Sequence, residues 1–84
     1  MELKDVAALM MSEDYKERFK AECLFLKAKY NGLTALLQKW DAGTLDFTPD
    51  CPRRLYDVQF RAMGDYLAIL EARAKMERVE LEDG

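Results

Sequence analysis

The sequence predicts an all-α protein in which two long helices form an antiparallel hairpin, and copies of that hairpin self-associate into a bundle. Apolar residues recur at alternating steps of four and three along residues 19–40, and similarly along residues 56–74. This spacing keeps one face of a helix apolar over several turns. The intervening residues 41–52 contain both prolines and a glycine, residue types that end and begin helices. The first seam comprises Phe19, Cys23, Leu26, Tyr30, Leu33, Leu37 and Trp40, and the second comprises Tyr56, Phe60, Met63, Leu67, Leu70 and Ala74.

The first long helix is expected at residues 13–40. Ser12 provides an N-cap, and acidic residues follow in the first turn, where negative charge interacts favourably with the helix dipole. Gly32 lies inside this helix, where a glycine costs about 1 kcal/mol relative to alanine. Either a close contact between helices or a slight bend explains this glycine, and we favour the close contact.

Residues 41–52 are expected to form a loop, with Gly43 in the left-handed conformation that ends many helices. Pro52 suits the first turn of the second helix, which is expected at residues 53–80, with Asp50 or Cys51 as its cap. About a dozen loop residues between two helices of similar length favour an antiparallel arrangement.

The 84 residues are expected to form a single domain, with a short helix or an arm at residues 1–11. Two helices alone cannot cover every apolar side chain, because several lie outside the two seams. Leaving them in water is unfavourable by roughly 25 cal/mol per Å² of apolar surface, so we expect a homo-oligomer. These outlying residues are Phe25, Leu36, Val58, Ile69 and Met76.

Composition excludes several classes of function. Thirteen basic and sixteen acidic residues give a formal charge of −3, which disfavours general DNA binding because that requires a cationic surface. The chain has no histidine, the commonest general base and metal ligand. We find no phosphate-binding glycine loop, metal-ligand cluster or nucleophile–base pair, and so expect no enzyme, metal or cofactor. With no apolar run of membrane length and only two cysteines, we expect a cytoplasmic protein with no membrane partner.

One face of the second helix combines polar and aromatic side chains in a pattern typical of ligand binding. Gln59, Tyr66 and Arg73 are spaced by seven residues and therefore share a face. On the first helix, Lys20 is expected near Arg73 and Lys27 near Tyr66. Because Arg and Lys bind phosphate and Tyr stacks on bases, these residues would line a pocket for an anionic nucleotide at a subunit junction.

The same residues have a purely structural explanation. Arg73 would then pair with Glu22 or Glu77, and the hydroxyl of Tyr66 would bond to a carbonyl, so that the face only holds the oligomer together. A second basic and aromatic cluster around Tyr15, with Lys16 and Arg18, is either part of a binding site or a solvated helix start.

Several loop and helix motifs resemble a family of small phage and prophage proteins that are named by relatedness to a gene of a gut crAss-like phage. The resemblance spans residues 11–81 and implies no activity. The residues that carry it are Ala42-Gly43-Thr44-Leu45-Asp46-Phe47-Thr48-Pro49, Cys51-Pro52, Gln59, Ala62-Met63, Tyr66-Leu67 and Leu70-Glu71-Ala72-Arg73.

In size and expected architecture the chain also resembles phage proteins that sequester the cyclic nucleotide signals of bacterial immunity, the anti-CBASS and anti-Thoeris sponges. These include small helical hairpins that form hexamers and bind cyclic di- or trinucleotides, or cyclic ADP-ribose isomers, between subunits through Tyr, Lys and Arg. The resemblance implies a phage-encoded, non-enzymatic anti-defence sponge in the cytoplasm of the infected bacterium. In it, Tyr66 would stack on a base while Arg73, Lys20 and Lys27 neutralise phosphates. Two other functions remain open, a helical adaptor that inhibits a host protein and a structural oligomer.

Overall fold

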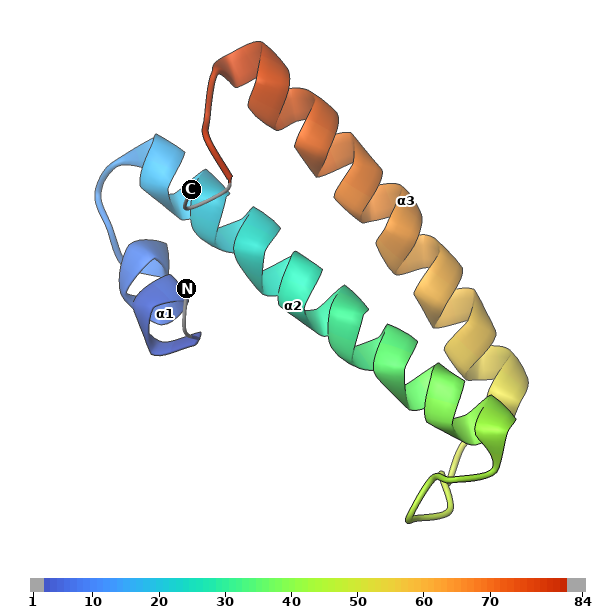
Figure 1. Cartoon of the computed structure of the whole chain (residues 1–84). Coiled ribbons are helices and arrows are strands. Elements are labelled where there is room, and N and C mark those ends of the chain that lie inside the picture. Colours follow the sequence, from blue (N-terminus) through green and yellow to red (C-terminus); the bar gives the residue numbers. More distant parts are fainter. Residues whose placement is uncertain (1–2, 82–84) are drawn as a thin grey trace.

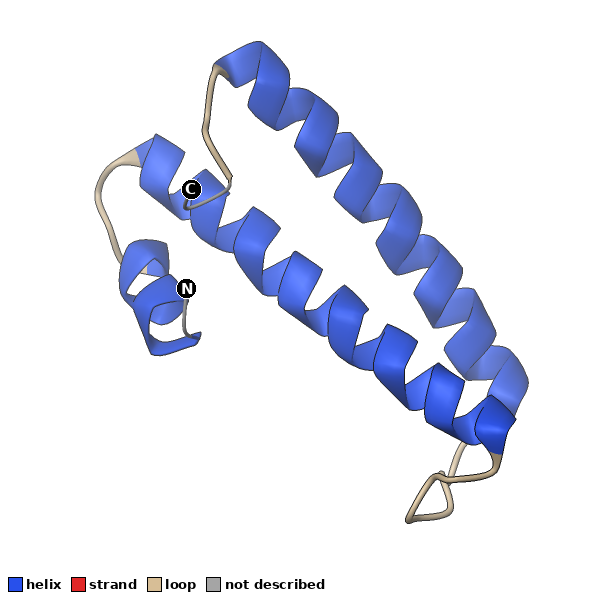
Figure 2. Cartoon of the chain, in the orientation of Figure 1, coloured by secondary structure: helices blue, strands red, loops and turns tan. Residues whose placement is uncertain are grey.

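The computed structural model of the chain describes residues 3–81, whose regular secondary structure consists of three helices (Figure 1). Helix α1 spans Leu3–Met10, α2 spans Tyr15–Ala42 and α3 spans Arg53–Glu77. No strand occurs in this part of the chain (Figure 2), so the prediction of an all-α fold is confirmed.

The two long helices lie side by side and run in opposite directions (Figure 1). Near the loop, the rings of Trp40 and Tyr56 meet edge to face with centroids 5.4 Å apart. Further along, Tyr30 stacks on Phe60 with centroids 4.8 Å apart. Helix α1 packs on α2, and among the described residues no Cα atom of α1 lies within 8 Å of a Cα atom of α3. The three helices therefore form two adjoining pairs that share α2.

The buried core lies at the end of the helix pair far from the loop. Its main cluster consists of Phe19 and Cys23 from α2 and Leu70 and Ala74 from α3, each at most 3% exposed, and Val6, Ala21 and Leu37 are also buried. After α3 the chain turns back, because Arg78 adopts a left-handed conformation with φ of 58°. This turn packs Val79 and Leu81 against the core, which closes the open end of the pair.

At the loop end, one arginine adds polar contacts to the packing of Trp40 on Tyr56. The guanidinium of Arg53 lies 5.2 Å from the ring centroid of Trp40, within the range of a cation–π contact. It also donates hydrogen bonds to Asp41 at 2.6 Å and to Asp57 at 2.8 Å. The hydrogen bond from Arg53 holds the pKa of the Asp41 carboxyl below its usual value. The end of α2 is thereby tied to the start of α3.

The N-cap of α2 is Asp14, so the expectation of Ser12 as the cap is wrong. The Asp14 carboxylate accepts a hydrogen bond of 2.9 Å from the backbone N–H of Lys16. Ser12 instead accepts a bond of 3.1 Å from the backbone N–H of Asp14 and thereby positions the cap. An ionised carboxylate at this place satisfies an orphan N–H and also interacts favourably with the helix dipole.

Both ends of α3 also differ from the sequence-based expectation. Pro52 itself is the N-cap and makes no side-chain capping bond, whereas Asp50 or Cys51 was expected in that role. The helix ends at Glu77 instead of residue 80, because the apolar residues beyond it gain more by turning back onto the core. Periodicity alone does not place this end, since the turn residue is an arginine and not a glycine.

Three glycines of the described chain have different roles. Gly43 has a φ of 73° and ends α2 in the left-handed conformation, as predicted. The close contact expected at Gly32 is wrong, because no described atom lies within 4 Å of a Cβ built there. The close contact occurs at Gly64, where such a Cβ would lie 3.3 Å from the ring of Tyr30.

Alanine substitutions at Gly32 and Gly43 are expected to change the free energy of unfolding in opposite directions. Gly32→Ala should raise the free energy of unfolding by about 1 kcal/mol, because it removes a helix-interior glycine and adds no clash. Gly43→Ala should lower it by about 1–2 kcal/mol, because the left-handed conformation is strained for alanine. Urea denaturation followed by circular dichroism measures both, and a loss with Gly32→Ala would show that Gly32 is in contact after all.

Candidate functional site

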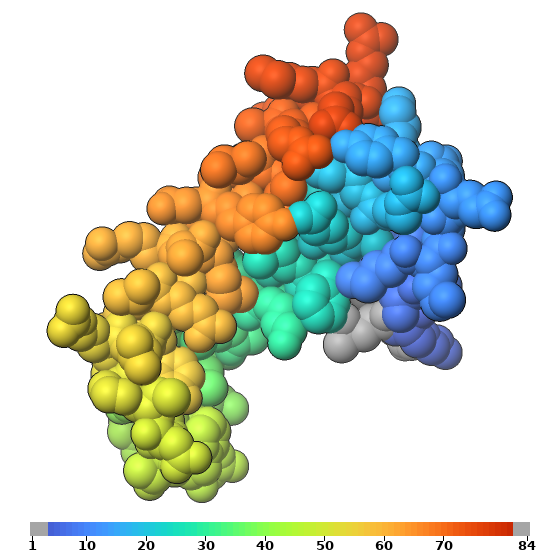
Figure 3. Space-filling view, turned by 180° about the vertical axis from the view of Figure 1, so that it is seen from behind, coloured from blue at the N-terminus to red at the C-terminus, as the bar shows by residue number. Residues whose placement is uncertain are grey.

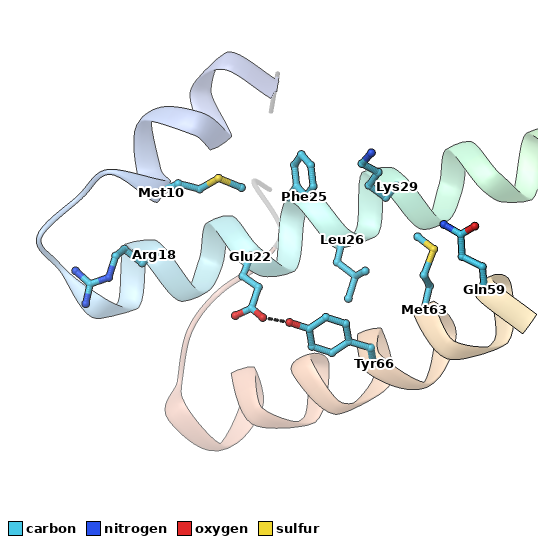
Figure 4. A pocket seen from close by; sticks show the side chains of 9 residues that line it. All are labelled: Met10, Arg18, Glu22, Phe25, Leu26, Lys29, Gln59, Met63 and Tyr66. Carbon is cyan, nitrogen blue, oxygen red and sulfur yellow. Dashed lines mark hydrogen bonds between the residues drawn. The ribbon is translucent and has the colours of Figure 1, made fainter.

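Two adjoining cavities run along one side of α2 and α3, and we call them together the lateral groove. Their volumes are about 510 and 450 Å³, and they share Phe25, Lys29, Gln59 and Met63. The first cavity is additionally lined by Met10, Arg18, Glu22, Leu26 and Tyr66 (Figure 4). The second is additionally lined by Ala28, Gly32, Leu33, Leu36 and Tyr56. Each cavity falls within the size range of small-molecule sites, roughly 300–1,000 Å³.

The charged residues of the groove come from one face of α2. Arg18, Glu22 and Lys29 are separated by four and seven residues, so they follow one another along the helix as a cation, an anion and a cation. Figure 4 shows Glu22 pointing toward α3, where its carboxylate accepts a hydrogen bond from the hydroxyl of Tyr66. Arg18 donates a bond of 2.9 Å to the carbonyl of Ser12.

Aromatic and apolar side chains complete the first cavity. Phe25 is 39% exposed and Tyr66 is 44% exposed, so both rings are accessible to a ligand. The ammonium of Lys29 lies 5.5 Å from the ring centroid of Phe25, at cation–π distance. Leu26 and Met63 add half-buried apolar surface between the helices. The groove therefore offers stacking surfaces beside two cations and one hydrogen-bonded carboxylate.

The structure brings only two of the predicted ligand-binding residues, Gln59 and Tyr66, into the groove. Arg73 is engaged elsewhere, with its guanidinium 4.6 Å from the ring centroid of Phe19. It donates hydrogen bonds of 2.9 Å to the Tyr15 hydroxyl and 3.3 Å to the Glu77 carboxylate. The Glu77 contact is the pairing foreseen in the structural explanation of these residues. Tyr15 and Arg73 thus hold the core end of the helix pair.

The two predicted lysines lie away from Tyr66. Lys27 and Lys29 are two residues apart, so their side chains leave α2 in directions that differ by roughly 160°. Lys29 lines both cavities of the groove, and Lys27 lines neither. Lys20 lines a separate cavity of about 260 Å³ beside Arg78, at the C-terminal turn. The expected grouping of Tyr66 with Lys20 and Lys27 does not form within one chain.

Sequence reasoning missed Lys29 as a groove residue and placed Arg18 in the separate cluster around Tyr15. The sequence shows the spacing of both cations from Glu22. That spacing indicates a binding site only when the side of α2 that Tyr66 contacts is known. Phe25 was noticed as an apolar residue outside the seam, and it marks this side in the structure. Helix periodicity gives angles around each helix separately, and the crossing of the two helices decides which flanks meet.

The two cysteines differ in accessibility, and we expect them to differ in reactivity. Burial raises the pKa of the Cys23 thiol to about 11, whereas Cys51 is exposed. Because the thiolate is the reactive form, one thiol per chain should react quickly with a disulfide reagent at pH 8. The second should react only in denaturant. A Cys51→Ser variant should lose the fast phase, and a fast phase that persists would contradict the burial of Cys23.

Within residues 3–81 no group of three or more His, Cys, Asp or Glu side chains is arranged to hold a metal ion. None of the described helices combines the length and apolar character needed to cross a bilayer.

Residues 13–76 match the model of the family described as Sequestin. The match spans α2, the loop and nearly all of α3, which is more than half of the chain, so the chain belongs to this family. The family name is consistent with a sequestering role. No curated protein matches the chain, and no solved structure matches it.

Proposed function

We propose that this member of the Sequestin family is a non-enzymatic sponge that binds a cyclic nucleotide immune signal in the lateral groove. The observation that carries the proposal is the alternation of Arg18, Glu22 and Lys29 beside the rings of Phe25 and Tyr66. A cyclic di- or trinucleotide, or a cyclic ADP-ribose isomer, presents phosphates, bases and ribose hydroxyls in close succession. The groove has a complementary group for each of these.

Each groove residue has a distinct role in this proposal. Arg18 and Lys29 bind the phosphates, because charge-assisted hydrogen bonds to phosphate are among the strongest available to side chains. Phe25 and Tyr66 stack on the bases, a contact worth about 1–3 kcal/mol per base. Glu22 accepts hydrogen bonds from an exocyclic amine or a ribose hydroxyl, and its bond from Tyr66 fixes its position.

Self-association is part of the proposal, because a second copy would close the open side of the groove. The chain exposes 6353 Å² of surface. A compact monomer of its mass, 9.8 kDa, exposes about 5,200 Å². The difference is larger than the roughly 800 Å² that each partner buries in a typical protein interface. This excess supports an oligomer whose interface includes Phe25, Leu36 and Met63.

The setting of the proposed sponge follows from the resemblance to phage anti-defence proteins. A phage-encoded sponge acts in the cytoplasm of the infected bacterium, where the host synthesises the signal. The runner-up function is a helical adaptor that inhibits a host protein, and the exposed apolar residues of α3, among them Val58 and Ile69, favour it.

Isothermal titration calorimetry with a panel of cyclic di- and trinucleotides and cyclic ADP-ribose isomers tests the proposal. We expect one class to bind with a Kd below about 10 μM, or roughly −7 kcal/mol. The linear form of the same nucleotide is the matched ligand control and should bind more weakly. Heat denaturation of the complex should release the ligand chemically intact, because a sponge does not convert it. Absence of binding across the panel overturns the proposal, and a converted ligand would show an enzyme instead.

A further inference from the structure

Helix α3 has a second apolar face, which we call the outer stripe. It follows the alternating steps of three and four that are typical of a coiled-coil seam, and all seven of its residues are exposed. It is offset by roughly 150° around the helix from the seam that packs on α2. Figure 3 shows α3 along one whole edge of the molecule. The stripe consists of Leu55, Val58, Ala62, Asp65, Ile69, Ala72 and Met76.

The apolar residues of the stripe are among the most exposed in the chain. Val58 and Ile69 are each 59% exposed and Met76 is 85% exposed. By contrast, none of the six residues of the inner seam is in the exposed class. An exposed apolar row of three heptads on a rigid helix is the kind of surface that marks a protein interaction site.

The charges beside the stripe all have one sign. The seven flanking positions hold four basic and no acidic residues, namely Arg54, Gln59, Arg61, Tyr66, Ala68, Arg73 and Lys75. Among the described residues, Arg54, Arg61 and Lys75 form no ion pair with an acid, whereas Arg73 pairs with Glu77. Within the stripe and its seven flanking positions the single acid is Asp65, which lies in the middle of the stripe itself.

This charge pattern argues against a second copy of α3 as the occupant. When two helices pack along such seams, their flanking residues meet across the interface, in parallel as in antiparallel pairs. The flanking charges of a second copy would also be basic, so no acid at these positions would pair with them, and an antiparallel pair would bring Arg54 close to Lys75 of the other copy. In a parallel pair, Asp65 would also face its own counterpart. Like charges in these positions are unfavourable and direct the surface toward a different partner.

A membrane is disfavoured by Asp65. Basic flanks beside an apolar stripe suit an anionic lipid surface in general. Here the stripe would carry the Asp65 carboxylate into the acyl region, at a cost of about 3 kcal/mol on insertion scales. A protein helix avoids this cost, because a lysine or arginine opposite Asp65 can pair with it. A polar residue at one seam position also fixes the register of the pair.

We propose that the outer stripe docks an amphipathic helix of another protein that has acidic flanks and one basic residue opposite Asp65. The stripe covers 22 residues, so the partner helix needs about 32 Å of length, or three heptads. The stripe itself lies outside the lateral groove, although its flanking residues Gln59 and Tyr66 also line the groove. Its occupation requires no nucleotide, so a peptide-binding experiment without nucleotide tests this proposal apart from the proposed function.

A pair of synthetic helical peptides tests the docking surface by fluorescence anisotropy. The first has Ile and Leu at its seam, Glu at its flanks and a Lys opposite Asp65. The second has the charges mirrored, with Lys flanks and a central Glu. The first peptide should bind the full chain with a Kd below about 10 μM at physiological salt, and the mirrored peptide at least about 10-fold more weakly. Equal binding of the two peptides, or no binding, overturns the proposal.

Matched charge reversals identify the surface. The double variant Arg54→Glu with Lys75→Glu alters the first and last turns of α3. It should weaken binding of the peptide with Glu flanks at least about 10-fold. Lys16→Glu with Lys39→Glu alters the equivalent turns of α2, gives the same net charge and should have little effect. Asp65→Lys should weaken binding, and a peptide with Glu at the central position should restore it.

Two alternative occupants are tested directly. Sedimentation of wild type and Ile69→Asp, a change at an exposed position, should give the same oligomer; dissociation of the variant would make the stripe an interface between copies. Binding to vesicles of phosphatidylserine and phosphatidylcholine in preference to the acidic peptide would make it a lipid surface. Either result overturns the proposal.

Discussion

Leu70→Ala should lower the free energy of unfolding by about 2–5 kcal/mol, because it leaves a cavity in the buried cluster to which, among the described residues, both long helices contribute. Leu70 is 0% exposed and contacts a core that includes Phe19 and Cys23. A chain of this size has a total stability of roughly 4–13 kcal/mol. The variant is therefore expected to lose a large part of its stability, as measured by urea denaturation and circular dichroism.

The adjacent residue provides the control for this experiment. Ile69 is 59% exposed on the outer stripe, so Ile69→Ala should change the free energy of unfolding by no more than about 0.5 kcal/mol. Because the two substitutions remove similar side chains one residue apart, their difference measures burial and not helix propensity. A large loss with Ile69→Ala would mean that the stripe is buried in an oligomer.

Lys29→Glu should weaken binding of the cyclic nucleotide by about 100-fold or more, because one charge-assisted hydrogen bond contributes about 1.5–3 kcal/mol and its reversal adds repulsion. Lys29 lines both cavities of the lateral groove. The measurement is calorimetry with the ligand class that binds the wild type, and circular dichroism checks that the variant remains helical.

Lys27→Glu is the matched control, with the same charge change two residues away on the opposite side of α2. It should leave the affinity within about 3-fold of wild type. This pair of variants also decides between two assignments, since the sequence pattern favoured Lys27 and the structure favours Lys29. A loss of binding with Lys27→Glu alone would support the original grouping, with the ligand held between subunits on the other flank.

The proposed ligand site could be predicted only in part. Tyr66 and Gln59 were found because their spacing by seven residues shows on the sequence alone. Arg73 shares that spacing but is engaged by Tyr15, Glu77 and Phe19, contacts that follow from how the helices pack. Lys29 was missed, and Arg18 was assigned to the cluster around Tyr15, because a helix presents cations on several flanks. Only the approach of α3 selects one of them.

The sequence by itself determined the helical fold class and the seams that face each other, because apolar periodicity records burial directly along the chain. It also determined the left-handed stop at Gly43, since few residues other than glycine adopt that conformation readily. The tertiary structure alone decided the return of Val79 to the core and the flank of α2 that Tyr66 contacts. Both outcomes depend on contacts between residues that are distant in the sequence, and a local pattern of residues does not record such contacts.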